Sequence, residues 1–192
     1  MRTTWLLPLA LIATPALSFD QAQVLQPAAL ADVKSVYVAP VALELPAPAR
    51  RFDAGGAAPR PVAPRDAETK AADLEAALRR GFGKSFAVVD SAAPGVLVVE
   101  ATLTRLESSR PTMADFRREP GLGFESVYAG GAAVSVRLSR DGQEVAVLKD
   151  RYIGTFADGT PRIGIWQDTD RAFTMWSRQL PGWVEQPQTA SR

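Results

Sequence analysis

The sequence predicts a single α+β domain, built from one mixed, mainly antiparallel sheet of about five strands with two helices packed on one face. Three observations lead to this prediction. Short Val-rich runs alternate with turn residues, two segments repeat apolar residues at helical spacing, and a strand–helix–strand unit precedes an Asp-Gly hairpin. The composition is that of a globular chain, since 46% of the 192 residues are hydrophobic and 22% are charged.

The N-terminus has the pattern of a cleavable export signal. A basic residue precedes an apolar stretch, residues 5–17, that is interrupted by prolines and too short to span a bilayer comfortably. Ala16 and Ser18 supply the small side chains that a signal peptidase requires, so we expect residues 1–18 to be removed by cleavage before Phe19. A cut after Ala16 is the alternative. The mature domain would then comprise residues 19–192.

The first half of the mature chain predicts a strand–helix–strand unit. Residues 33–45 alternate apolar side chains and predict a strand, which Pro40 should place at a sheet edge or interrupt with a bulge. A long loop rich in Pro and Ala, 46–65, follows. Helical spacing then predicts a helix over about 67–81, capped by Asp66 and ended by a glycine in the left-handed conformation.

The second half predicts further strands and another helix. The expected strands cover residues 86–90, 96–106, 133–139 and 144–150, with a second long loop at 107–131. Apolar residues from Asp168 to Leu180 share one helical face, and Pro181-Gly182 should end that helix.

The last two strands are expected to form a hairpin. They are joined by Asp141-Gly142, a pair typical of a tight turn in which both residues adopt positive φ. The hairpin residues expected in the core are Val134, Val136, Leu138, Val145 and Val147.

Missing residue types exclude several classes of function. The chain has no His and no Cys, which removes His/Cys zinc sites, Ser-His-Asp and Cys-His catalysis, iron–sulfur clusters and disulfides. A formal net charge of +1 gives no field suited to nucleic acid. Gly83-Lys84-Ser85 imitates the end of a phosphate-binding loop, but it lacks the first glycine and follows a helix. The sequence therefore indicates no catalytic residue, no cofactor and no metal ion.

The second long loop, residues 107–131, carries the best candidates for a binding surface. Loops of this length are rare without a function, and this one combines cations with aromatic rings, as protein interfaces do. The candidate residues for contact with a protein partner are Arg110, Phe116, Arg117, Arg118, Phe124 and Tyr128. The alternative is a loop folded over a sheet edge that buries Phe116 and Phe124.

Side chains around the last helix allow more than one interpretation. Asp168 and Asp170 could hold a hard cation, but acids at the start of a helix are typical of caps. Trp166 and Trp183 flank this helix and suit either the core or a surface patch.

Four stretches of the chain resemble a known family: VYVAPVALEL, LEAALRRGFGKSFAVVD, APGVLVVEATLTRLESS and YAGGAAVSVRLSRDGQEVAVLKDRYIG. Together they span about residues 30–180 and are similar to the bacterial domain-of-unknown-function 3313 family, whose C-terminal helix bears a Trp. The resemblance implies an envelope protein of unassigned function and carries over no catalytic residue. Many members of that family are lipoproteins acylated on a Cys. Phe19 stands at that position here, so we expect no lipid anchor.

These observations favour a non-enzymatic, periplasmic or cell-envelope accessory protein that binds an envelope protein, either free in the periplasm or peripheral to the outer membrane. The rivals are a periplasmic enzyme using carboxylates, Ser or Lys, and a carrier for a small apolar ligand. Two facing acids in a pocket would favour the enzyme, and a closed cavity would favour the carrier. An exposed apolar patch near the second long loop would favour the interaction protein. The oligomeric state is left open.

Overall fold

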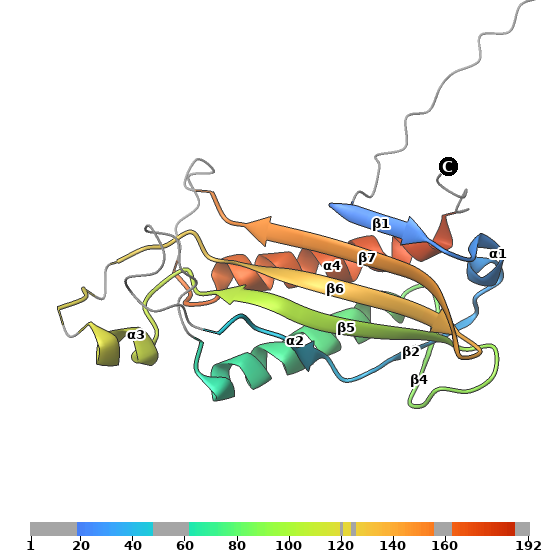
Figure 1. The fold of residues 1–192 in the computed structure, drawn as a ribbon, viewed down its shortest axis with the longest axis horizontal. Helices are drawn as coiled ribbons and strands as arrows, with labels where there is room; N and C mark the ends of the chain where they lie inside the picture. Colours follow the sequence, from blue (N-terminus) through green and yellow to red (C-terminus); the bar gives the residue numbers. More distant parts are fainter. Residues whose placement is uncertain (1–18, 48–61, 120, 124–125, 156–162, 187–192) are drawn as a thin grey trace, which may run out of the picture.

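The computed structural model describes residues 19–47, 62–119, 121–123, 126–155 and 163–186. They form two layers, a seven-stranded mixed sheet and two long helices, α2 and α4, that cover one of its faces (Figure 1). The strands are β1 (Gln21–Val24), β2 (Ser35–Val38), β3 (Ala42–Leu43), β4 (Ala87–Val89), β5 (Leu97–Glu107), β6 (Gly131–Arg140) and β7 (Gln143–Ile153). The helices are α1 (Pro27–Leu30), α2 (Pro64–Phe82), α3 (Met113–Arg118) and α4 (Gln167–Glu185).

The α+β class and the mixed sheet are confirmed, but the prediction of about five mainly antiparallel strands is wrong. The strand order is β1-β7-β6-β5-β2-β4, with β3 also beside β5. The pairs β1–β7, β7–β6 and β6–β5 are antiparallel. Strand β2 pairs parallel with both β5 and β4, and β3 pairs parallel with β5. The predicted strand 33–45 is split at Pro40, which has no N–H to donate, so β2 and β3 pair with successive parts of β5.

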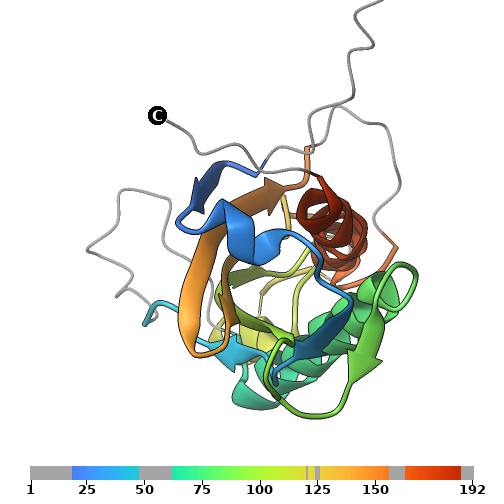
Figure 2. The same cartoon turned by 90° about the vertical axis from the view of Figure 1, so that its right-hand side faces the viewer.

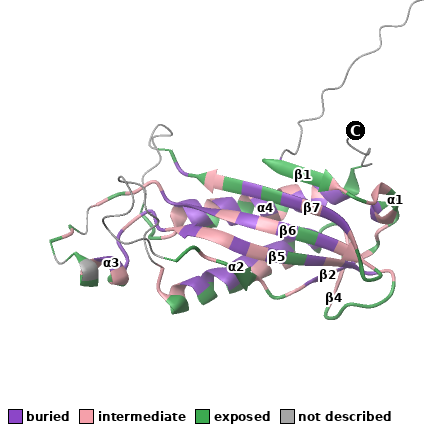
Figure 3. Ribbon diagram, in the orientation of Figure 1, coloured by how far each residue is buried: buried purple, intermediate pink, exposed green. Residues whose placement is uncertain are grey.

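The core lies between the two long helices and the inner face of the sheet. Burial alternates along β5, where Leu97, Val99, Ala101 and Leu103 point inward and the intervening residues face outward (Figure 3). The largest fully buried side chains on the helices are Leu74, Leu78 and Phe82 of α2 and Trp176 and Leu180 of α4. None of the described helices lies over the outer face of the sheet, an arrangement that antiparallel strands permit (Figure 1).

The hairpin between β6 and β7 confirms the predicted turn. Asp141 and Gly142 have φ values of 54° and 76°. The register shifts between Leu138 and Ser139, where β7 has one extra residue. As a result Val145 and its neighbour Ala146 are both buried, and Val147 is only half-buried, so the prediction that Val147 belongs to the core is wrong.

Helix α2 begins and ends differently from the prediction. Pro64 is its first residue, which suits a position where no N–H is needed, and Ala63 precedes it without a side-chain cap bond. Asp66 lies in the first turn and is not the cap. Gly83 follows the helix with φ of −62°, so the predicted left-handed glycine is wrong as well.

Helix α4 continues through Pro181 and Gly182 to Glu185, so the prediction that this pair ends the helix is wrong. The last turn buries Trp183 and Val184 against the core, and this burial favours continuing the helix. Trp183 is therefore a core residue rather than part of a surface patch.

Helices α2 and α4 approach closely at Gly81. A Cβ atom at this position would overlap the carbonyl oxygen of Ser177 in α4. That carbonyl is the one that Pro181, four residues later, cannot hydrogen-bond because it lacks an N–H. The glycine thus lets the backbone of α2 pack against a carbonyl that its own helix leaves unpaired.

The predicted signal peptide, residues 1–18, lies outside the described residues, as do residues 48–61 of the first long loop. None of the helices that are described has the length and apolar character needed to cross a bilayer.

Candidate functional site at the loop end

One end of the domain gathers the segments that the sequence analysis singled out. There β5 ends, β6 begins, β7 ends and α4 begins, and α3 projects beside them (Figure 1). We term this region the loop end and define it as the described parts of residues 107–131, 152–155 and 163–169.

The segment 107–131 is more ordered than the predicted long loop. Strand β5 extends to Glu107, and α3 occupies six residues of the connection. Thr112 and Asp115 cap α3 reciprocally. The Asp115 carboxylate accepts hydrogen bonds from the backbone N–H of Thr112 at 2.7 Å and from its hydroxyl at 2.8 Å. Both residues are buried, so the cap also fixes where α3 begins.

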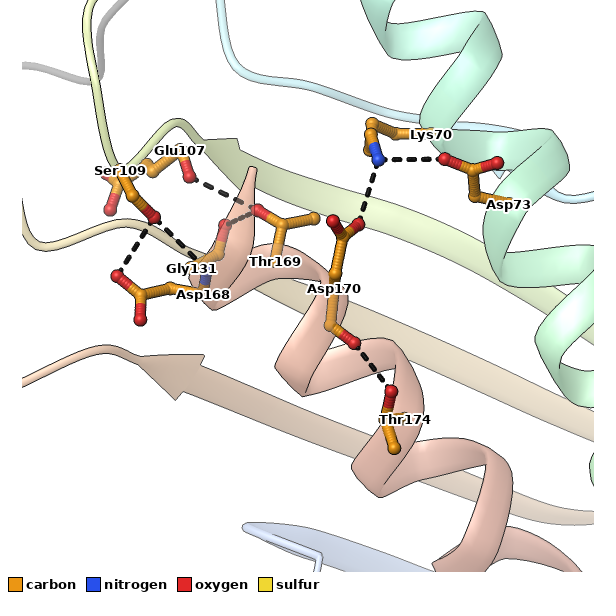
Figure 4. Close-up of polar contacts among 9 residues, drawn as sticks. All are labelled: Lys70, Asp73, Glu107, Ser109, Gly131, Asp168, Thr169, Asp170 and Thr174. Carbon is orange, nitrogen blue, oxygen red and sulfur yellow. Dashed lines mark hydrogen bonds and ion pairs between the residues drawn. The ribbon is translucent and has the colours of Figure 1, made fainter. Parts of the chain in front are cut away.

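Ser109 and Asp168 form a buried hydrogen-bonded centre beneath the loop end. The Ser109 hydroxyl donates to the Asp168 carboxylate at 3.0 Å and accepts from the Asp168 backbone N–H at 3.1 Å (Figure 4). The same carboxylate accepts from the backbone N–H of Gly130 at 3.2 Å. Asp168 is 1% exposed and Ser109 is fully buried. These bonds join the end of β5, the approach to β6 and the start of α4.

Backbone bonds of Ser109 extend this centre. Its N–H donates to the carbonyl of Ile165 at 2.6 Å, and its carbonyl accepts from the N–H of Tyr128 at 2.9 Å. A Cβ atom at Gly154 would overlap the Asp168 carboxylate, so any larger residue there would have to displace that side chain. The loop end is therefore held by buried, directional bonds.

Thr169 fastens the first turn of α4 to the sheet. Its hydroxyl lies 3.2 Å from the carbonyl oxygen of Glu107 and 3.0 Å from that of Gly131, where β5 ends and β6 begins (Figure 4). The side chains of Asp168 and Thr169 thus form hydrogen bonds with neighbouring segments. Trp166 occupies the N-cap position of α4, and its side chain makes no capping hydrogen bond. The prediction that Asp168 is a helix cap is wrong.

Asp170 joins α4 to α2 instead of capping its own helix. The Lys70 ammonium lies 2.8 Å from the Asp170 carboxylate and 2.8 Å from that of Asp73 (Figure 4). Burial lowers the pKa of Lys70. The hydrogen bonds that its ammonium donates to Asp170 and then to Asp73, together with the charges of these two carboxylates, outweigh this effect, so the pKa is raised above its ordinary value. The charged lysine therefore links α2 to α4 through its ion pair with Asp170.

The predicted binding residues that the structure describes lie at this end but differ in exposure. Arg117 is exposed, whereas Arg110, Phe116 and Tyr128 are half-buried and each has an interaction partner. The side chain of Arg118 and the whole of Phe124 lie outside the described residues.

Exposed aliphatic side chains were missed by the sequence analysis. They are Met113, Val127, Ile153, Ile163 and Ile165, with exposed fractions of 67%, 40%, 41%, 81% and 45%. All five belong to the loop end. Its segments are held together by bonds from the Ser109 N–H to the Ile165 carbonyl, from the Tyr128 N–H to the Ser109 carbonyl and from the Gly154 N–H to the Gly130 carbonyl. Elsewhere in the described chain, the large exposed apolar residues are Leu25 and Leu43. Most of these residues stand singly in irregular segments and share no helical or strand periodicity, so local sequence patterns do not reveal them.

Other sites for chemistry are sparse in the described residues. No group of three acids, His or Cys is placed to hold a metal ion there. A surface hollow of about 620 Å³ lies at the opposite end, between α1, the start of β4 and the last turn of α4. Its lining includes Leu30, Asp32, Phe86 and Val184.

Fold and site together define a two-layer α+β domain with a buttressed, partly apolar loop end. The chain belongs to the family described as "Protein of unknown function (DUF3313)", whose model matches residues 21–180. The resemblance drawn from the sequence is thereby confirmed. No curated protein matches the chain.

Two solved structures are similar to this chain at low identity. One is a variant of PelC from Paraburkholderia phytofirmans, a dodecamer, with 13% identity and a TM-score of 0.44 over 83% of this chain and 95% of that one. The other is protein XCC0632 from Xanthomonas campestris, of family DUF330, with 13% identity and a TM-score of 0.45 over 79% of this chain and 83% of that one.

Proposed function

We propose that this chain is an exported, non-enzymatic protein of the cell envelope that binds a protein partner through its loop end. The observation that carries the proposal is that five exposed aliphatic residues belong to the loop end, in the described parts of residues 107–131, 152–155 and 163–169. Exposed apolar side chains that gather in one region are typical of interaction sites, because covering them removes apolar surface from water.

The support beneath the loop end favours a binding surface over a simple connection. Bonds from Ser109, Asp168 and Thr169 are buried, so the segments bearing the aliphatic residues have fixed positions before any partner arrives. A preorganised surface loses less conformational entropy on binding. The exposed Arg117 adds a cation at the rim. The partner we propose therefore has an apolar centre and acidic residues at its edge.

The buried acids of this end support a non-enzymatic role. Asp115 accepts two hydrogen bonds from Thr112, and Asp168 accepts one each from Ser109 and Gly130. Carboxylates that already accept two or more hydrogen bonds in a packed interior serve structure, whereas a catalytic acid or base must reach a substrate.

The interface is tested by removing its aliphatic side chains. We would compare the wild type with the variant I153S/I163S/I165S and with the control L25S/L43S, whose exposures of 43% and 36% are close to those of Ile153 and Ile165. Tagged proteins would be isolated from periplasmic extract with their partner, whose affinity is then measured with purified components. Loss of about 2 kcal/mol, or about 30-fold in affinity, is expected for the loop-end variant alone.

The contrary results are equally definite. Equal partner binding by the wild type and the loop-end variant would reject this surface, provided that circular dichroism shows both to be folded.

Localisation is tested separately. N-terminal sequencing of protein released by osmotic shock should begin at Phe19, and retention of residues 1–18 would contradict export.

A further inference from the structure

Asp150 is a buried carboxylate without a positively charged partner among the described residues. It lies on the inner face of β7 and is 8% exposed. One oxygen accepts the indole N–H of Trp176 at 2.6 Å, and the other accepts the backbone N–H of Asp20 at 3.3 Å. No described Lys or Arg forms an ion pair with it. Burying a carboxylate is costly, and two neutral donors leave its charge uncompensated.

Phe19 is packed into the domain next to this carboxylate. Its ring is 9% exposed and meets Trp183 edge-to-face, with ring centroids 6.5 Å apart and planes at 88°. Strand β1, which follows directly, lies at the edge of the sheet beside β7 and near the end of α4 (Figure 2). The residue expected to begin the mature chain therefore occupies a built site, which we term the N-terminal clasp: Phe19, Asp150, Trp176 and Trp183.

The backbone places the nitrogen of Phe19 close to Asp150. Asp20, the next residue, donates its N–H to Asp150, and successive backbone nitrogens are less than 4 Å apart, so the Phe19 nitrogen lies within about 7 Å of that carboxylate oxygen. Because Gln21 pairs with Lys149, Asp20 and Asp150 occupy facing positions. Two acids facing each other across strands repel unless a cation lies between them.

We propose that the N-terminal clasp is a receptor for the ammonium group that export processing creates on Phe19. Hydrolysis breaks the Ser18–Phe19 peptide bond; water supplies a hydroxyl to the Ser18 carboxyl group and a hydrogen to the Phe19 nitrogen. That amine then takes up a proton and becomes the countercharge of Asp150. Cleavage thus supplies the positive charge that the buried Asp150 lacks in the folded domain. This inference rests on the export proposed above, but it can be tested without it.

The charge on the new amine makes the stability of the folded domain depend on pH. Pairing with Asp150 raises its pKa above the ordinary α-amino value of about 7.7–8.0. A group whose pKa is raised on folding stabilises the fold fully below its unfolded pKa and loses this effect as pH rises through the folded value. The other charged groups nearby are Asp20, Glu44, Lys149 and Arg151, which line one hollow, and Arg171 of α4, which reaches Tyr152.

The experiment compares the mature chain, residues 19–192, with the same chain acetylated on the Phe19 nitrogen. Acetylation keeps the ring and removes the charge, while every other charged group stays the same. Urea unfolding at about pH 6.5 should give an unfolding equilibrium constant about tenfold larger for the acetylated chain. The difference should vanish in D150N and persist in the control D90N, because the Asp90 side chain is 95% exposed and lies away from the clasp.

Equal stability of the two forms, or a difference that persists in D150N, would overturn the proposal. If D150N does not fold, the pH profile decides. A difference that is lost as pH rises above about 8 supports the clasp, and one that is independent of pH overturns it. Because both forms are prepared with a defined N-terminus, failure here is distinguishable from failure of export, which only the localisation assay reports.

Discussion

Replacing Asp168 with alanine should destabilise the domain by about 3 kcal/mol. The carboxylate accepts hydrogen bonds from the Ser109 hydroxyl and the Gly130 N–H, at 3.0 and 3.2 Å, and it is 1% exposed. Its removal leaves two buried donors without this acceptor, and each unsatisfied donor costs about 1–3 kcal/mol. The sum is a large part of the total stability of about 5–15 kcal/mol that is typical of a domain.

Urea unfolding of the variant measures this loss directly. Hydrogen exchange should also quicken at Ser109, Tyr128 and Gly154, whose amides donate within the bonded network around Asp168. The matched control is D90A, because the Asp90 side chain is 95% exposed and its ion pair with Arg79 lies at the surface, where no measurable change is expected. An unfolding midpoint for D168A equal to that of the wild type would refute the role assigned to this carboxylate.

Three further predictions concern the scaffold. G81A should cost about 1–3 kcal/mol in urea unfolding, because the new methyl group meets the Ser177 carbonyl, and an unchanged midpoint would mean that the helices can separate freely. V136D should cost several kcal/mol by burying an unpaired carboxylate at a position that is 2% exposed, and normal thermal unfolding would contradict the assigned inner face. K70M should have a smaller free energy of unfolding than the wild type at neutral pH. Because the pKa of Lys70 is raised on folding, this difference between the two proteins should decrease above about pH 10.5. A difference that increases there would contradict the ion pairs.

The parts of the fold that were predictable from sequence are those with local causes. Apolar spacing located α2 and most of α4, and Asp141-Gly142 located the hairpin, because helical periodicity and turn chemistry act within a few residues. Strand β1 escaped prediction because it has only four residues, three of them exposed, and is defined by pairing with β7 more than 100 residues away. The continuation of α4 beyond Pro181 depends on the burial of Trp183, which is also a tertiary effect.

The sequence pointed to only one of the segments that form the loop end. The segment 107–131 was identified from its length and composition, but its aromatic residues Phe116 and Tyr128 are half-buried. The buried centre joins Ser109 to Asp168, which are 59 positions apart in the sequence. Local sequence patterns do not reveal a contact between residues so far apart. The sequence predicts a helix cap at Asp168 because acids at a helix start have that role most often.

Site-specific photo-crosslinking in living cells tests the interaction surface most directly. A photoreactive residue would replace Ile163, which is 81% exposed at the loop end, or Leu25, which is 43% exposed and lies outside the loop end. The account predicts one discrete crosslinked protein from position 163, formed in the cell envelope and missing from position 25. No crosslink from position 163, or the same crosslinked proteins from both positions, would contradict partner binding through the loop end.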